Sequence, residues 1–144
     1  MVLFSGEYLC KIDAKGRLSL PAKVKANLPV PFQKEVVLRR STDPCLVVYT
    51  QIGFQKLASK VSALNEFDPR QRKLQRSFFG SVSEVSLDSA GRVLVPRKML
   101  EYASLEKEGV IVGLGDRLEI WNPKAYRSVQ DEDIDTLEQE FLIE

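Results

Sequence analysis

The chain contains two copies of one sequence pattern, and this internal repeat limits its possible folds more than any other feature. Four residues recur at a constant offset of 75 positions, where Asp13, Gly16, Arg17 and Pro21 return as Asp88, Gly91, Arg92 and Pro96. The likeness continues beyond the proline, where Val36-Val-Leu resembles Val110-Ile-Val and Leu46-Val-Val-Tyr49 resembles Leu118-Glu-Ile-Trp121, the latter at an offset of 72. A fixed period predicts that each copy, of about 45 residues, is one supersecondary unit.

Each copy begins with a predicted β-hairpin around its Asp-x-x-Gly turn. Short runs with β-branched or aromatic residues precede the turns, at 8–12 and 82–87. The aspartate can accept hydrogen bonds from backbone two residues on, and the glycine tolerates the positive φ that closes a bulged hairpin. In the first return strand Leu18 and Leu20 alternate with Arg17, which predicts a buried apolar face and an arginine on the other face.

The rest of each copy reads as a short helix, two strands and a second helix. A proline follows each return strand, and proline is favoured at the first position of a helix. We therefore expect helices over 22–28 and 97–103, and further helices that begin at Thr50 and at Asn122, where an N-cap residue stands. The predicted order in each copy is β-β-α-β-β-α.

A further helix is predicted between the copies. Asp68 is its N-cap, Pro69 lies in its first turn, and Gln71 is the return partner of a capping box. Leu74 and Phe78 share one face of this helix, and basic residues occupy the others: Arg70, Arg72, Lys73 and Arg76. We interpret it as a solvated helix that covers the core, with direct contact to nucleic acid as the alternative.

These elements divide the chain into four expected segments. They are a first unit (7–54), connecting helices (55–82), a second unit (83–126) and an acidic C-terminal tail (127–144). In the tail, Ile134, Leu137 and Phe141 stand at helical spacing among acidic residues. Such a segment is either a helix that docks on a neighbour or a mobile end.

The net charge of +1 conceals a strong gradient along the chain. Residues 1–80 carry +8, residues 81–130 are neutral, and residues 131–144 carry −7. A basic half followed by an acidic tail is typical of a polyanion binder whose tail competes with the ligand or aids solubility, although a solvated surface also fits.

The residue types that are missing exclude several classes of function. The chain has no histidine, which removes Cys/His zinc sites and Ser-His or Cys-His catalysis. Cys10 and Cys45 lie in apolar, strand-like runs and are expected to be buried free thiols. No glycine-rich phosphate loop or nucleophile elbow is present. We therefore expect no catalytic residues, cofactor, metal or small-molecule substrate.

Nothing in the sequence predicts a membrane segment or export. No apolar stretch approaches the roughly 20 residues that a membrane helix requires, and Met1-Val-Leu-Phe lacks the basic region and apolar segment of a secretory signal. We expect a cytoplasmic protein without a membrane partner.

The paired turns closely resemble those of the MraZ family of bacterial transcriptional regulators. The matching motifs are the Phe-x-Gly opening, Ile-Asp or Leu-Asp before the turn, Lys-Gly-Arg-Leu-Ser-Leu-Pro after it, and Pro-x-x-Arg-x-x-Gln-Arg before the second copy. The resemblance implies an α+β, β-rich fold of tandem AbrB-like swapped-hairpin units that form a pseudo-twofold double-split barrel with short helices. It also implies a nucleoid-associated, ring-shaped homo-oligomer that binds direct repeats in the promoter of the division and cell-wall gene cluster, mainly as a repressor.

The family's Asp-x-x-x-Arg motif falls on Asp13 and Arg17 and on Asp88 and Arg92. Five basic residues lie in or around the first motif, with Asp13 as the only acid among them: Lys11, Lys15, Arg17, Lys23 and Lys25. The second motif has a mixed charge environment. Each pair has a purely structural interpretation as well, in which the aspartate caps its turn and pairs with its arginine.

We expect the first turn to make the principal contact with DNA and the second turn to contribute less. Arg17 reads or clamps double-stranded DNA, because its planar fork can grip phosphate or the O6/N7 edge of guanine. Lys11 and Lys15 contact phosphates, and Asp13 sets the direction of the arginine. Arg92, held by Asp88, is a second-rank contact or a structural one.

Two alternatives involve the tail. AbrB-like units also occur in antitoxins, where a tail embraces a partner protein, although such chains carry a single unit and dimerise. In the other alternative, the tail shields the basic half of a neighbouring subunit and tunes its affinity for DNA.

Overall fold

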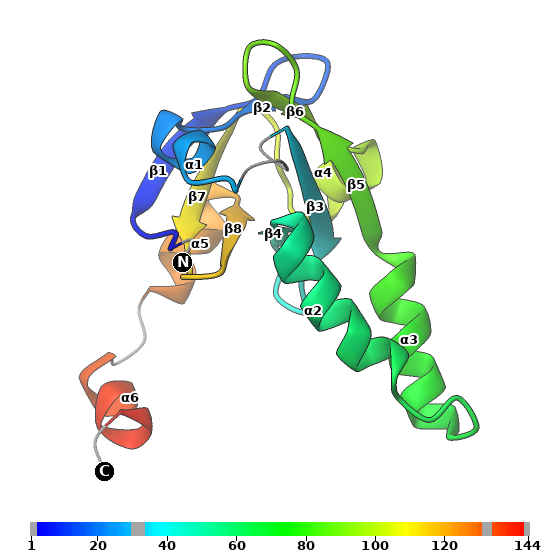
Figure 1. Ribbon diagram of the computed structural model, residues 1–144. Coiled ribbons are helices and arrows are strands. Elements are labelled where there is room, and N and C mark those ends of the chain that lie inside the picture. Colours follow the sequence, from blue (N-terminus) through cyan, green and yellow to red (C-terminus); the bar gives the residue numbers. More distant parts are fainter. Residues whose placement is uncertain (1–2, 30–33, 131–133, 143–144) are drawn as a thin grey trace.

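The computed structural model describes residues 3–29, 34–130 and 134–142 (Figure 1). The first copy consists of β1 (Glu7–Lys11), β2 (Arg17–Ser19), α1 (Ala22–Ala26), β3 (Glu35–Arg40), β4 (Leu46–Tyr49) and α2 (Gln51–Ser62). After α3 (Pro69–Gly80), the second copy consists of β5 (Val82–Ser86), β6 (Arg92–Leu94), α4 (Arg97–Tyr102), β7 (Glu108–Gly113), β8 (Arg117–Trp121) and α5 (Pro123–Val129). A last helix, α6 (Ile134–Phe141), follows. The predicted β-β-α-β-β-α order is confirmed for both copies.

The two copies exchange their first hairpins. One sheet has six strands in the order β1-β7-β8-β4-β3-β5, so β1 pairs with a strand of the second copy and β5 with a strand of the first. The return strands β2 and β6 pair with each other. Isolated bridges from Ile12 to Leu18 and from Leu87 to Val93 join this ribbon to the larger sheet and close the barrel. This is the tandem swapped-hairpin fold that the resemblance implies.

Equivalent residues pair with each other at two places, which defines a pseudo-twofold axis. Leu18 is opposite Val93 in the centre of the β2–β6 ribbon, and the two are related by the repeat offset of 75. Val47 is opposite Glu119 in the β4–β8 pair, at the offset of 72. The two halves therefore face each other as the subunits of a symmetric dimer would.

Strand pairing corrects one part of the sequence comparison. Val37 is opposite Tyr49 and Val110 is opposite Trp121, so Val37 is the equivalent of Val110, at an offset of 73. The sequence comparison aligned Val36 with Val110, which is wrong by one residue. Val36 and Val37 are both buried, because β3 is covered on its two faces. Without polar alternation, an aliphatic run fixes no register.

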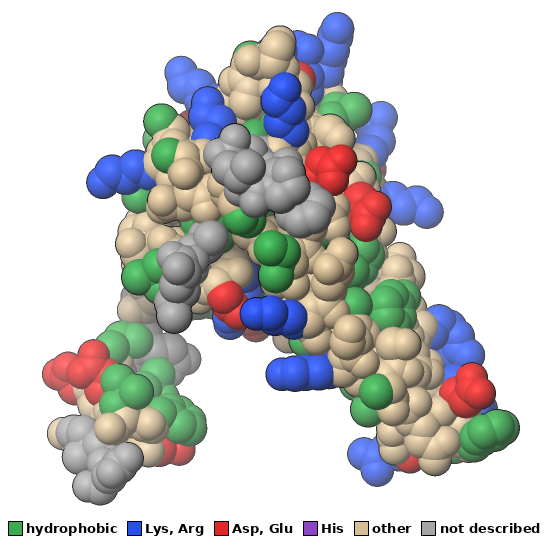
Figure 2. All heavy atoms as spheres, in the orientation of Figure 1, with side chains coloured by type: hydrophobic (Ala, Val, Ile, Leu, Met, Phe, Trp, Pro, Cys, Tyr) green, Lys and Arg blue, Asp and Glu red, His purple; other side chains and the backbone are tan. Residues whose placement is uncertain are grey.

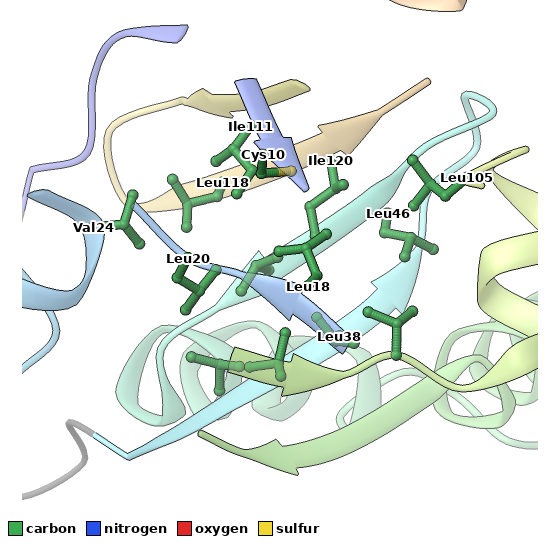
Figure 3. Close-up of a cluster of buried hydrophobic side chains, with 14 of the residues drawn as sticks. Cys10, Leu18, Leu20, Val24, Leu38, Leu46, Leu105, Ile111, Leu118 and Ile120 are labelled. Carbon is green, nitrogen blue, oxygen red and sulfur yellow. The ribbon is translucent and has the colours of Figure 1, made fainter. Parts of the chain in front are cut away.

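The barrel core draws its side chains from both copies. Figure 3 shows Leu18 and Leu20 of the β2 segment beside Ile111, Leu118 and Ile120 of the second copy. The alternation predicted for the return strands is confirmed, because Leu18 and Leu20 are buried in one copy, as are Val93 and Val95 in the other. Leu94, which lies between the latter two, is 57% exposed.

The two cysteines are buried free thiols, as predicted. Burial raises the pKa of the Cys10 thiol to about 11 and that of the Cys45 thiol to about 12. Both thiols are therefore protonated and unreactive at neutral pH.

Helices α2 and α3 form a hairpin that covers the outer face of β3 and β4 and then projects from the barrel (Figure 1). Phe54 of α2 packs on Tyr49, and its ring stacks on Phe78 at a centroid distance of 5.7 Å. The prediction that α3 covers the core holds only for its C-terminal end, because Phe78 is buried while Leu74 is 54% exposed. The reason is that α3 packs mainly beside α2 rather than over the sheet.

The predicted helix starts are confirmed, with one difference in detail. Thr50 and Asn122 accept backbone hydrogen bonds at the starts of α2 and α5, and Asp68 does so at the start of α3. The Gln71 side chain was expected to bond the backbone N–H of Asp68. It instead donates to the Asp68 carboxylate and accepts from the backbone N–H of Asn65, which ties α3 to the loop before it.

The predicted tail falls partly on α5 and α6, and its residues 131–133 and 143–144 lie outside the described residues. Figure 1 shows α6 apart from the barrel, and its apolar residues Ile134, Leu137 and Phe141 are exposed. Across the described ranges, no helix has the length and apolar character needed to cross a bilayer.

A substitution in the central ribbon tests whether the β2–β6 pair holds the two halves together. Leu18→Ala is expected to lower the free energy of unfolding by about 2–5 kcal/mol, because it opens a cavity at a fully buried site. Leu94→Ala, in the same ribbon but exposed, is the matched control and should change it by less than about 0.5 kcal/mol. Urea denaturation followed by circular dichroism measures both, and equal effects would contradict this account of the core.

Candidate nucleic-acid interface

The two Asp-x-x-Gly-Arg turns lie side by side at one end of the barrel, at the top of Figure 1. The β2–β6 pairing brings them together, since each turn leads directly into one of these strands. Figure 2 shows Lys and Arg side chains gathered around this end of the molecule. The α2–α3 hairpin projects from the opposite end, so the basic residues of α3 do not join this group.

In the first turn, one carboxylate organises both the backbone and the arginine. Oδ1 of Asp13 accepts from the backbone N–H groups of Lys15 (3.0 Å) and Arg17 (2.9 Å), and Oδ2 accepts from Nε of Arg17 (2.6 Å). The N–H of Gly16 donates to the Asp13 carbonyl, and the φ of Gly16 is +85°, a conformation that a residue with a side chain rarely adopts. The spacing of aspartate, glycine and arginine in the motif therefore follows from the hydrogen bonds and the backbone conformation of the turn.

The second turn repeats this geometry. Oδ1 of Asp88 accepts from the backbone N–H groups of Ala90 (2.9 Å) and Arg92 (2.9 Å), and Oδ2 accepts from Nε of Arg92 (2.9 Å). The φ of Gly91 is +76°. The structural interpretation of the aspartate, as a cap for the turn and a partner for the arginine, is thus correct in both copies.

This arrangement fixes each arginine by a hydrogen bond to Nε. Among the described residues, no hydrogen bond engages the Nη atoms of Arg17 or Arg92. The side chains of Arg17 and Arg92 are 33% and 31% exposed. A guanidinium oriented in this way can present two parallel N–H groups to a phosphate or to the O6/N7 edge of guanine.

The two turns are linked across the copies. Nη1 of Arg92 lies 3.7 Å from Oδ2 of Asp13, so the second arginine contacts the carboxylates of both turns. The backbone N–H of Val95 donates to the Gly16 carbonyl (3.0 Å), and that of Leu20 donates to the Gly91 carbonyl (3.2 Å). The turns form one surface because each is held by the strand that follows the other.

Both carboxylates are ionised at neutral pH. The pKa of Asp13 is lowered mainly by the backbone N–H of Arg17, and the pKa of Asp88 mainly by that of Arg92, with the arginine side chains adding to the effect. A charged acceptor strengthens the hydrogen bonds that hold each guanidinium.

The exchange of hairpins also places the helix that follows each return strand against the turn of the other copy. A β-carbon at Gly16 would lie 3.0 Å from Cδ1 of Leu100 in α4, and one at Gly91 would lie 2.5 Å from both Cδ and Nζ of Lys25 in α1. Charge counted along the sequence assigns Lys25 to the first turn. The structure instead places it against the second.

The structure brings five of the six predicted site residues into one group: Asp13, Lys15, Arg17, Asp88 and Arg92. Lys15 is exposed within the first turn, whereas Lys11 is the exposed last residue of β1 and is opposite Glu108 in the strand register. The residue that sequence reasoning misplaced is Lys25, and the repeat itself holds the signal, since the offset of 75 makes it the equivalent of Leu100. Within the described residues, no group of three His, Cys, Asp or Glu side chains could hold a metal ion.

Comparison with known proteins places the repeat in one family. The family model described as "MraZ protein, putative antitoxin-like" matches the chain twice, over residues 3–77 and 78–141. A protein of Cytophaga hutchinsonii named transcriptional regulator MraZ is 50% identical over 133 residues, which is 91% of this chain and 88% of that protein. Proteins with the same name from Hydrogenovibrio crunogenus and Thermomicrobium roseum are 33% and 38% identical, over 94% and 85% of this chain and 90% and 83% of their own lengths.

The depressed pKa of each turn carboxylate predicts a pH dependence of stability. The unfolded chain takes up these protons at a higher pH than the folded chain, so the stabilisation is present above the ordinary aspartate pKa, about 4, and is lost as the pH falls below it. Asp13→Asn keeps an oxygen acceptor but cannot titrate. Its urea midpoint should therefore fall less than that of the wild type between pH 5 and pH 2.

Asp135→Asn, on α6 and away from the turns, is the matched control for this experiment. Its midpoint should follow the wild-type pH profile. Parallel profiles for wild type and Asp13→Asn would show that the charge of Asp13 does not stabilise the turn.

Proposed function

Because the chain belongs to the MraZ family, we propose that it is a transcriptional regulator that binds promoter DNA through its paired turns. In the full form of this proposal, it is a sequence-specific repressor of the division and cell-wall gene cluster. It binds direct repeats in double-stranded DNA as a ring-shaped homo-oligomer. It acts in the cytoplasm, associated with the nucleoid, and is not an enzyme.

The observation that carries this proposal is the pair of arginines held side by side by Nε. Asp13 and Asp88 hold the two guanidinium groups by hydrogen bonds to Nε, and the described residues make no hydrogen bond to their Nη atoms, which supports a role in gripping an external anion. A carboxylate that served stability alone would have no need to orient an arginine in this way on an exposed turn, because exposed ion pairs contribute little.

Each site residue then has a role in docking. Arg17 reads or clamps a base edge or phosphate, and Lys15 and Lys11 contact the DNA backbone and position the duplex. Asp13 orients Arg17, as Asp88 orients Arg92, which is the secondary contact. Lysines suit the backbone role because they act as point charges, whereas the planar fork of arginine adds geometric selectivity.

Assembly of several chains supports tight binding to repeated sites. One chain presents a small contact surface and is expected to bind weakly alone. In a ring, neighbouring chains would present several such surfaces to one duplex, and linked weak contacts gain affinity through effective concentration. Subunits related by rotation would meet successive copies of a sequence in the same orientation, which accounts for direct repeats as the target.

Removing one arginine tests the proposed function. A bidentate contact contributes about 1–3 kcal/mol, and Arg17→Ala removes it from every subunit, so binding to the promoter region upstream of the protein's own gene should be abolished. Fluorescence anisotropy with a labelled duplex measures the affinity. Arg70→Ala, on the distant α3, removes the same charge and should bind as the wild type does.

Circular dichroism and size-exclusion chromatography complete this experiment. The Arg17→Ala protein should remain folded and oligomeric. An unfolded or dissociated variant would show that the arginine is structural, and unchanged binding would contradict the proposed contact.

Binding to the same duplex should also weaken steeply as salt rises. Each phosphate neutralised by Lys or Arg releases counterions, so the logarithm of the binding constant should fall linearly with the logarithm of salt, with a slope of about −0.9 per contact. A titration of binding between about 50 and 200 mM salt measures this slope. A flat response would exclude docking dominated by phosphates.

A further inference from the structure

The two turns differ in charge at one equivalent position. Lys15 stands before the glycine of the first turn, and Ala90 stands before the glycine of the second. Both residues are exposed, and both backbone N–H groups donate to the aspartate of their own turn. The second turn therefore contains no counterpart of the lysine that the first turn presents.

A second difference between the copies offsets the first. The side chain of Lys25 in α1 packs against Gly91 of the second turn. Its equivalent, Leu100 of α4, packs against Gly16 of the first turn. A β-carbon at Gly91 would come within 2.5 Å of Cδ and Nζ of Lys25, so the end of the lysine side chain lies directly against the glycine. Each turn thus has one lysine against it, from the turn itself in the first case and from a helix of the other copy in the second.

The environment of Lys25 favours an external anion as its partner. Within the described residues Lys25 forms no ion pair, and the carboxylate of the turn against which it lies, Asp88, is already engaged by Arg92. Lys25 is half-buried against the turn, whereas Lys23 on the same helix is exposed. A lysine whose methylene stem is packed loses less freedom when its ammonium group binds, which makes it a better fixed contact than a lysine in solvent.

We propose that Lys25 is the DNA-backbone contact of the second turn and fills there the role that Lys15 has in the first. This inference rests on the proposed function and extends it. The second turn then holds a complete contact set, with Arg92 oriented by Asp88 and a lysine beside it. Each chain presents two equivalent contact sets related by the pseudo-twofold axis, rather than one principal contact and one secondary contact.

The test compares two lysines of one helix. Lys25→Leu places at this position the residue that stands at the equivalent position of the second copy, and Lys23→Leu removes the same charge from the exposed side. Lys25→Leu should reduce the salt slope of duplex binding by about one for each chain that contacts the duplex. The affinity at 0.15 M salt should fall by about fivefold per contacting chain, and Lys23→Leu should have a clearly smaller effect.

A compensating variant separates a contact from a packing effect. Ala90→Lys introduced into Lys25→Leu gives the second turn the arrangement of the first, with a lysine in the turn and a leucine on the helix. It should restore both the affinity and the salt slope. Thermal unfolding of all three variants confirms that each is folded.

The outcomes distinguish this inference from the proposed function. If the wild type binds the duplex and Lys25→Leu binds equally well, or no worse than Lys23→Leu, Lys25 is not a contact. If Ala90→Lys fails to restore binding by a folded protein, the lysines are not equivalent and the inference is wrong. If the wild type binds neither the promoter duplex nor one of random sequence, the proposed function itself fails.

Discussion

The antiparallel pairing of β2 with β6 is the constraint on which the rest of the molecule depends. Leu18 and Val93 meet at its centre and are fully or almost fully buried, so the ribbon forms only where the apolar faces of both copies meet. This pairing commits β1 and β5 to strands of the opposite copy, closes the barrel, and brings the two turns to one end of it. The core and the basic surface are therefore two results of one pairing.

In each turn, a single carboxylate binds both the backbone of the turn and its arginine. Asp13 uses one oxygen for the turn backbone and the other for its arginine, so the conformation of the loop and the direction of the guanidinium cannot vary independently. Asp88 does the same in the second copy. The motif joins local folding to the direction of the arginine, and a side chain already held in place loses little freedom on binding a partner.

Much of this could be predicted from the sequence, since its strongest signals are local. The repeat offset, the Asp-x-x-Gly turn and the alternation around Leu18 each depend on residues close together in the chain, and the structure confirms the elements they predict. The exchange of hairpins was expected only through family resemblance, because no local pattern states which copy a strand joins. The two positions that the sequence places wrongly have separate causes. Lys25 is close to Arg17 in sequence but packs against Gly91, and the aliphatic run at Val36 carries no polar alternation to fix its alignment.

The α2–α3 hairpin that connects β4 to β5 has a consequence for evolution as well as for assembly. In a homodimer of single units, the halves separate on dilution and every substitution appears twice. A covalent connection makes the pairing of the two turns independent of protein concentration and lets each half change alone. The two halves already differ in this way, with a lysine at position 15 against an alanine at position 90 and a lysine at 25 against a leucine at 100. A pseudosymmetric chain can in this way adjust two faces to the two unlike strands of an asymmetric DNA repeat.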